Sequence, residues 1–190
     1  MTKKILKGLD RISTVKAIII LLLFFMISYF MINGNIVGVA KLETMTGGTS
    51  ILDITTGYTV DEAYDLLESL GDSGRQHYLS RIIPIDFVFP ISYALFFMSV
   101  LTMLIRTNYK DRRNLQLLGL IPITCLLFDY SENICVINLL LNYPTRLTTL
   151  TKVSSVFTQI KFTMFAVSIL MIVMFGVMLI VKLLNRRKAG

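Results

Sequence analysis

Four long apolar runs dominate the chain and limit what it can fold into. They cover about residues 15–33, 85–105, 115–141 and 153–184. Each is close to or above the roughly 20 apolar residues that a helix needs to cross the hydrocarbon core of a bilayer. Since lipid offers no hydrogen bonds to the backbone, runs of this length predict helices. The sequence therefore predicts an all-α polytopic membrane protein with four transmembrane helices.

Composition and charge agree with this interpretation. Of the 190 residues 54% are hydrophobic, and the formal net charge is +7. The basic residues stand at the ends of the apolar runs, so membrane orientation explains them better than binding to nucleic acid. We expect one membrane domain over residues 1–190, with membrane lipids as partners and no nucleic acid.

The distribution of Lys and Arg predicts the topology. One side of the membrane receives 13 of the 19 basic residues: Lys3, Lys4, Lys7, Arg11, Lys16, Arg106, Lys110, Arg112, Arg113, Lys182, Arg186, Arg187 and Lys188. The other side receives five: Lys41, Arg75, Arg81, Arg146 and Lys152. The positive-inside rule then predicts that both termini are cytoplasmic. We expect a multi-pass protein of the plasma membrane. Cleavage of the first run as a signal peptide would instead leave three spans.

The only long loop, residues 34–83, is predicted to face outward. Its first part, around residues 47–50, is rich in Gly and Thr and is expected to fold irregularly over the bundle. Thr59 and Glu62 form a capping box, which predicts a short helix over about 60–70 that stops at Gly71. A second short helix is expected over about 73–83. The acidic side chains of the first helix indicate a solvated face or a lid on the outer mouth.

Ionisable residues inside the runs are the most informative feature, because they are costly in lipid and usually face a bundle interior. Asp129, Glu132 and Asn133 share one helix face of the third run. Lys161 lies at about the same depth in the fourth run as Glu132 in the third, ~12 and ~14 Å from the outer ends. A contact of Lys161 with Glu132 or Asp129 is therefore predicted.

The second run adds polar residues from the same side. Asp86, Pro90 and Tyr93 share a face, and Pro90 and Pro122 are expected to kink their helices. The predicted buried cluster consists of Asp86, Tyr93, Asp129, Glu132, Asn133 and Lys161. The predicted rim above it consists of Arg75, Tyr78 and Arg81.

Several kinds of site are not expected. Cys125 and Cys135 are ten residues apart in one run, about 15 Å along a helix, which is too far for a disulfide between them. The chain has a single histidine, His77, and no Ser/His/Asp set, HExxH, P-loop or dinucleotide fingerprint. We therefore predict neither a metal site nor a cofactor.

An ordered set of short motifs carries a resemblance. It contains Gly57-Tyr58, Asp61-Glu62-Ala63-Tyr64, Leu66-Leu67-Glu68, Leu70-Gly71, Gly74-Arg75 and Tyr78, then Asp86, Phe89-Pro90, Tyr93, Asp129 and Glu132-Asn133. Over roughly residues 57–161 the chain resembles an uncharacterised family of small four-span bacterial membrane proteins. The resemblance implies no known activity or cofactor. It implies that Arg75, Asp86, Asp129, Glu132 and Asn133 matter as a group.

The function stays open between several interpretations. The preferred one is a non-catalytic or ligand-binding bundle, whose cluster opens outward to a lipid or small-molecule ligand. In its plainest form the cluster is a buried network that fixes helix register. The alternative is an intramembrane enzyme that acts on a lipid or lipid-linked substrate, with Asp86, Asp129 and Glu132 as candidate acids and bases. The third is a subunit of a proton-coupled transporter.

Overall fold

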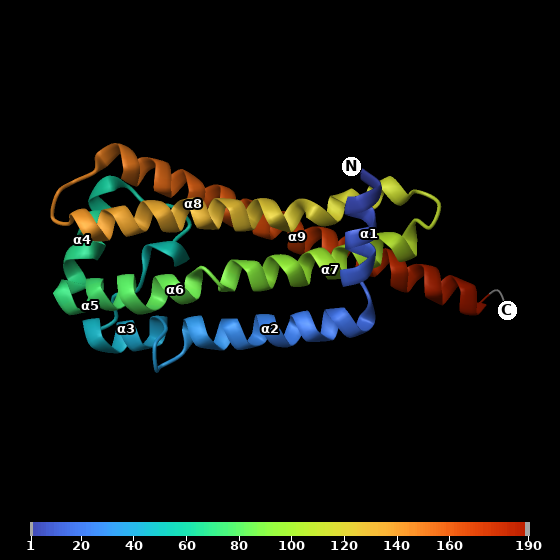
Figure 1. The fold of residues 1–190 in the computed structure, drawn as a ribbon, viewed down its shortest axis with the longest axis horizontal. Coiled ribbons are helices and arrows are strands. Elements are labelled where there is room, and N and C mark those ends of the chain that lie inside the picture. Colours follow the sequence, from blue (N-terminus) through green and yellow to red (C-terminus); the bar gives the residue numbers. More distant parts are fainter. Residues whose placement is uncertain (1, 189–190) are drawn as a thin grey trace.

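A computed structural model describes residues 2–188 of the chain, and they form an all-helical bundle (Figure 1). Within this range, four helical segments are long and apolar enough to cross a membrane. They are α2 (Val15–Asn33), the run Gly71–Asn108, the run Arg113–Asn142 and α9 (Thr148–Lys188). The protein is thus an all-α polytopic membrane protein, as the sequence predicts.

The second membrane segment begins earlier than expected. It consists of α5 (Gly71–His77), a π-helical turn η2 (Tyr78–Ile82), α6 (Ile83–Asp86) and α7 (Phe89–Asn108). The short helix expected over 73–83 is therefore continuous with the span and does not form a separate loop helix. The third segment consists of the 3₁₀ helix η3 (Arg113–Leu120) and α8 (Ile121–Asn142).

The prolines begin helices and do not kink them from inside. Pro122 occupies the first turn of α8, where its missing N–H has no helical partner to lose. Pro90 occupies the first turn of α7, directly after the break between α6 and α7. Side chains of α8 satisfy the carbonyls freed at this break. The Tyr130 hydroxyl donates to the Phe87 carbonyl at 2.5 Å, and Asn133 Nδ2 donates to the Asp86 carbonyl at 3.3 Å.

Residues 34–77, which we call the cap segment, cover one end of the bundle. The segment contains α3 (Val39–Thr46), η1 (Leu52–Ile54), α4 (Val60–Ser69) and α5. The expectation of irregular structure is wrong for residues 39–46, because Val39 and Leu42 bury a small apolar face there. Gly47 ends α3 with a φ of 74°, which glycine adopts without strain. The apolar residues of the cap segment share one core with α8, around Leu67, Leu139 and Val136.

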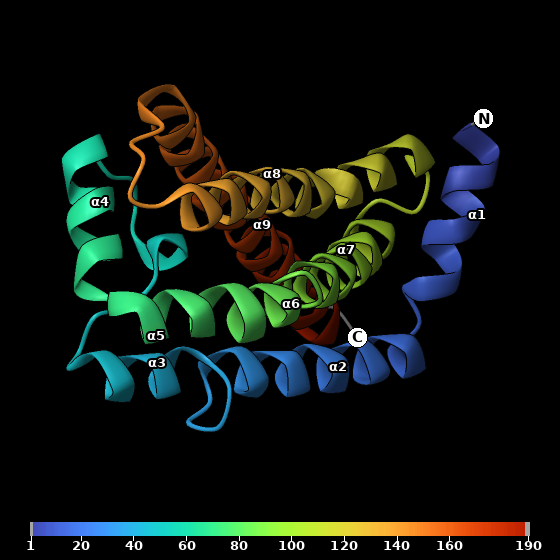
Figure 2. The ribbon, with the colours of Figure 1, turned by 60° about the vertical axis from the view of Figure 1, so that its left-hand side comes forward.

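Helix α4 follows its sequence signals closely. Thr59 accepts from the Glu62 backbone, and the Glu62 carboxylate accepts in return from the Thr59 backbone, which completes the predicted capping box. The acidic residues Asp61, Glu62, Asp65 and Glu68 are all exposed. Figure 2 shows α4 lying across one end of the bundle and α1 (Thr2–Ile12) across the other.

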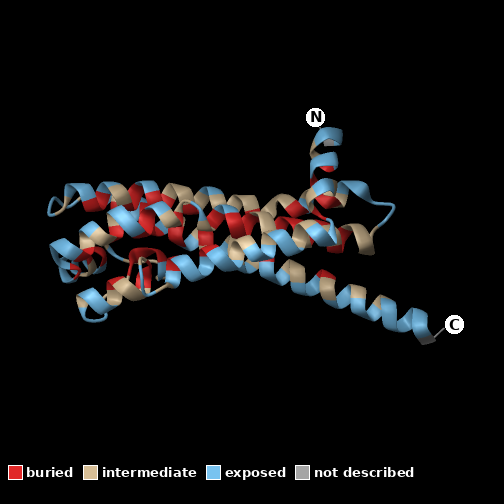
Figure 3. Cartoon of the chain, turned by 60° about the horizontal axis from the view of Figure 1, so that its bottom comes forward, coloured by how far each residue is buried: buried red, intermediate tan, exposed pale blue. Residues whose placement is uncertain are grey.

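The end opposite the cap segment, which we call the terminal end, carries both chain termini (Figure 1). Helix α1 was not expected from the sequence, although its apolar residues recur at helical spacing. Leu6 and Leu9 pack on Met98 of α7, and lysines occupy the other face. Helix α9 is 41 residues long, about 60 Å at the helical rise of ~1.5 Å. Its last turns extend beyond the bundle and are exposed (Figure 3).

Candidate functional site

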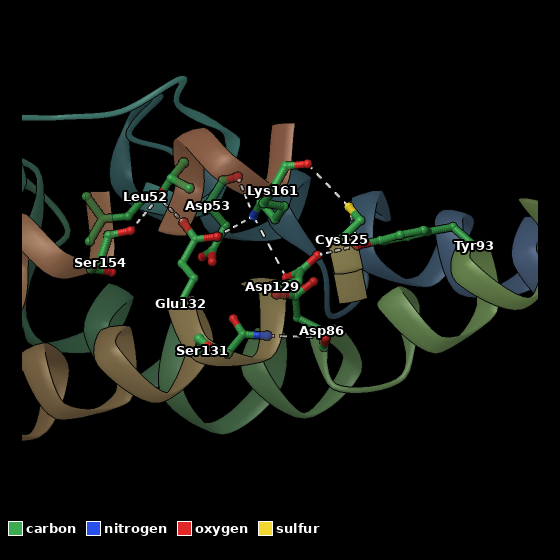
Figure 4. Close-up of polar contacts among 12 residues, drawn as sticks. Leu52, Asp53, Asp86, Tyr93, Cys125, Asp129, Ser131, Glu132, Ser154 and Lys161 are labelled. Atoms are coloured by element: carbon green, nitrogen blue, oxygen red, sulfur yellow. Dashed lines mark hydrogen bonds and ion pairs between the residues drawn. The ribbon is translucent and has the colours of Figure 1, made fainter. Parts of the chain in front are cut away.

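The intramembrane charges gather around Lys161 of α9, near the cap segment (Figure 4). Its Nζ lies 2.5 Å from Glu132 Oε2 and 3.8 Å from Asp129 Oδ1, and it donates to the Asp53 carbonyl at 3.1 Å. The contact with Glu132 is the one predicted from helical depth. We define the polar cluster as Asp53, Asp86, Asp129, Glu132, Asn133 and Lys161, all of which are buried.

Neighbouring hydroxyl groups hold three of the four carboxylates. Thr158 donates to Glu132 Oε1 at 2.5 Å. Tyr93 donates to Asp129 Oδ2 at 2.9 Å, and Tyr78 donates to Asp53 Oδ2. Each hydroxyl comes from a different helix than the carboxylate that it contacts. The carboxylates are therefore fixed in position by contacts between elements.

Asp86 is the exception. Its side chain is 7% exposed, and its Oδ2 has no hydrogen-bond partner within residues 2–188. No ion pair to Asp86 is present in the described chain either. The backbone carbonyl of Asp86 accepts a hydrogen bond from Asn133 Nδ2. A buried acceptor without a donor is costly, so Asp86 Oδ2 is available for a hydrogen bond from an incoming group.

A cavity of about 200 Å³ lies directly beside these carboxylates. Its polar walls are Asp53, Asp86, Asp129 and Lys161. Its aromatic walls are Phe89, Tyr93, Phe162 and Phe165. Ile32 at the end of α2 and the half-exposed Ile54 of η1 complete the wall on the opposite side. The cavity thus lies among α2, α6, α7, α8 and α9, next to the cap segment.

Two tyrosines of the cap segment and α7 connect the site to its surroundings. Tyr58 donates to Ser154 Oγ at 2.7 Å, and its backbone N–H donates to Ser155 Oγ at 2.9 Å. Burial raises the pKa of Tyr58 above its ordinary value, so its hydroxyl remains a donor. Tyr93 contacts both Asp129 and Cys125, whose sulfur lies 3.0 Å away. The cap segment is therefore fastened to α9 at the level of the cluster.

The structure brings together all six residues of the predicted cluster but not the predicted rim. Tyr78 is fully buried and contacts Asp53, so it belongs to the interior. Arg75 donates to the Leu67 carbonyl at 2.6 Å and lies over the Tyr143 ring. Arg81 is exposed and forms no ion pair within the described chain. Neither arginine contacts the cluster.

Asp53 is the residue of the site that the sequence analysis missed. It lies in the Gly- and Thr-rich stretch that carried no periodic pattern. A signal was nevertheless present, since Asp53 is the single charged residue in the apolar run Ile51-Leu52-Asp53-Ile54. A lone carboxylate among apolar neighbours is typical of a buried polar contact.

Comparison with protein-family models, with curated proteins and with solved structures finds no match to this chain. Within residues 2–188, no three His, Cys, Asp or Glu side chains are arranged to hold a metal ion. Both cysteines are buried and free. The chemistry available in the site is thus that of carboxylates, one ammonium group, hydroxyls and aromatic rings.

Proposed function

We propose that this protein is a non-catalytic, ligand-binding membrane protein, and that the cavity beside Asp86 is its binding site. The observation that carries the proposal is Asp86 Oδ2, which is buried at the cavity wall and accepts no hydrogen bond within the described chain. Each of the other carboxylates of the cluster accepts a hydrogen bond from a hydroxyl group, and Lys161 pairs with Glu132. A ligand with a complementary group would restore the interaction that Asp86 lacks.

The same proposal includes a location. The cavity opens toward the outer side of the plasma membrane, and both termini are cytoplasmic. The basic segments at the N-terminus, in the α7–α8 loop and at the C-terminus support this, since they lie at the terminal end of the bundle (Figure 1). A cytoplasmic terminal end satisfies the positive-inside rule.

Cysteine labelling tests the orientation. Cys125 and Cys135 are buried, so they can remain in the chain. In intact cells, a membrane-impermeant maleimide should label Ser73→Cys, which is an exposed position of α5. It should label Asp111→Cys, an exposed position of the α7–α8 loop, only after the membrane is permeabilised. The reverse pattern would contradict the orientation.

Native mass spectrometry of the purified chain tests the binding itself. Wild-type protein should retain a small molecule through mild detergent extraction. Ile54→Trp at the cavity wall should reduce its occupancy, because the larger ring enters the space that the ligand needs. Ile36→Trp is the matched control, since Ile36 is 86% exposed and lies outside the cavity. A wild-type chain without any retained molecule would contradict the proposal.

An intramembrane enzyme is the second candidate. Asp86 and Asp129 line the same cavity, one of them free and the other held by Tyr93. Two carboxyl groups in unequal surroundings are suited to acid–base chemistry. An enzyme would release a changed molecule, and Asp129→Asn would stop that change while the ligand still binds. A binding protein would release the molecule unaltered, both as the wild type and as the Asp129→Asn variant.

A further inference from the structure

The charge balance of the cavity distinguishes between classes of ligand. Four carboxyl groups surround a single ammonium group, that of Lys161. This ammonium is already in contact with Glu132, with Asp129 and with a backbone carbonyl. Lys161 is the only Lys or Arg among the described residues that line the cavity. An anionic ligand would meet carboxylates without a free cation, whereas a cationic ligand would meet the charge that it needs.

The unsatisfied atoms are hydrogen-bond acceptors. Asp86 Oδ2 and Asp53 Oδ1 are both buried without a donor in the described chain, and both residues line the cavity. Their side chains are more than nine-tenths buried. A primary ammonium carries three N–H donors, whereas a quaternary ammonium carries none. A cation with N–H groups would supply donors to these acceptors and a complementary charge at the same time.

Aromatic rings form the remaining walls of the cavity. Tyr93 lies edge-on to Phe89 at 5.4 Å and to Phe165 at 5.6 Å between ring centroids. Phe162 already lies 5.4 Å from Lys161 Nζ. Ring faces attract cations, with a contribution of roughly 0.5–2 kcal/mol that increases when the cation is desolvated. The aromatic walls therefore favour a cationic ligand, as the carboxylates do.

Size and position limit the ligand further. The cavity of about 200 Å³ is below the roughly 300–1,000 Å³ of sites that enclose a drug-sized molecule. An aminoalkyl group fits it, but a whole phospholipid does not. The walls include residues of α2 and α9, two membrane-spanning helices whose exposed residues are largely apolar. A headgroup can enter here while its chains remain in the bilayer.

We propose that the cavity binds a primary alkylammonium group, such as that of an ethanolamine headgroup, between the carboxylate of Asp86 and the aromatic ring of Tyr93. This inference rests on the proposed function, because it names the ligand class of the same site. The ligand is either the headgroup of a membrane lipid or a free amine with the same ammonium group.

The test measures binding of defined probes to the full-length chain in detergent micelles. The probes are phosphatidylethanolamine, phosphatidylcholine, phosphatidylglycerol and free ethanolamine. Retained lipid is measured by native mass spectrometry, and the shift in Tm is measured in parallel. Phosphatidylethanolamine should bind about tenfold or more tightly than phosphatidylcholine, the difference expected for charge-assisted hydrogen bonds that only the primary amine makes. Free ethanolamine distinguishes the two sources: equal stabilisation by it identifies a soluble amine, and stabilisation by the lipid alone identifies a headgroup.

Two variants connect this binding to Asp86. Asp86→Asn keeps the shape of the side chain and removes its charge, so binding of phosphatidylethanolamine should become about tenfold weaker. Its Tm without lipid should stay at least equal to that of the wild type, since no described partner loses a contact. Asp65→Asn, on the exposed face of α4, is the control and should bind as the wild type does.

The outcomes separate the two proposals. Equal binding of phosphatidylethanolamine and phosphatidylcholine, or unchanged binding by Asp86→Asn, would overturn the ammonium inference. If phosphatidylglycerol binds instead and Ile54→Trp prevents it, the ammonium inference is wrong and the ligand-binding function stands. If no probe binds and no molecule is retained from cells, both proposals are wrong.

Discussion

The two ends of the bundle differ in how far their ion pairs are buried. Near the cap segment, Lys161 and its carboxylates are buried and held by hydroxyls from several helices. At the terminal end, Asp10 pairs with Arg106 at 3.4 Å and with Arg113 at 2.6 Å. These side chains keep 30–59% of their surface exposed. Among the described residues, both ends carry exposed ion pairs, such as Arg146 with Asp61 at the cap end, but only the cap end also holds a buried one.

This difference predicts which contacts matter. An exposed ion pair contributes roughly 0–1 kcal/mol, because water and salt already stabilise its partners. Removal of one partner from a buried pair is costly, since the other charge remains without solvation. Substitutions near the cap segment should therefore have larger effects than equivalent substitutions at the terminal end, and a set of four variants spans the range.

Lys161→Met should have the largest effect. It leaves Glu132 and Asp129 without their cation, and we expect a loss of about 3–5 kcal/mol in the free energy of unfolding. Titration with a denaturing detergent measures it. The double variant Lys161→Met with Glu132→Gln is the control and should recover most of the loss, because it removes both charges of the closest pair. Unchanged stability of the single variant would show that the buried ion pair contributes as little to stability as an exposed one.

Tyr78→Phe should have an intermediate effect. It removes the only hydroxyl that donates to Asp53 Oδ2 in the described chain, and this contact joins η1 to the second membrane segment. We expect a loss of about 1–3 kcal/mol, the range for a buried acceptor left unsatisfied. Backbone hydrogen exchange should become faster in residues 51–55 before it does so elsewhere in the chain. Exchange that rises uniformly along the chain would argue against a local role for this contact.

Thr59→Ala tests the exposed part of the cap segment, where we expect a loss of about 1 kcal/mol in the stability of α4. Hydrogen bonds from the Thr59 backbone and hydroxyl lower the pKa of Glu62. The contribution of Glu62 is therefore full above its unfolded pKa and is lost as the pH falls through its lower folded pKa. The protection of residues 60–69 against hydrogen exchange, corrected for the intrinsic pH dependence of exchange, should fall in acid for the wild type. It should fall less for Glu62→Gln, which keeps the cap without an ionisable group.

Asp10→Asn at the terminal end should have the smallest effect. The two ion pairs of Asp10 are partly exposed, so we expect a change of below about 1 kcal/mol. The difference in Tm from the wild type should shrink further at high salt, since salt screens surface charges. An effect as large as that of Lys161→Met would remove the contrast between the two ends.

The membrane helices were predictable because long apolar runs have one solution in lipid. The contact between Lys161 and Glu132 was also predictable, since helical rise converts a residue count into depth. The same arithmetic placed Asp86 and Tyr93 on one face of the second segment. For these residues, local geometry alone determines which side chains meet.

The remaining parts depend on contacts between distant segments. Asp53 joins the cluster because the cap segment folds back under its own apolar residues, and no periodic pattern around Asp53 indicates this. Tyr78 is buried because the helix continues without interruption from α5 into the span, which shifts the face that each residue occupies. The rim prediction was wrong for this reason.

The position of Lys161 in the last helix has a consequence for biosynthesis. A ribosome makes the chain from its N-terminus, so Asp86, Asp129 and Glu132 are all made before the lysine that stabilises them. Until α9 is inserted, these carboxyl groups are at membrane depth without a cation, and charges there are costly. A chain that terminates early should therefore be held back by the insertion machinery or degraded. We expect the earlier helices to become stable in the bilayer only once α9 has been made.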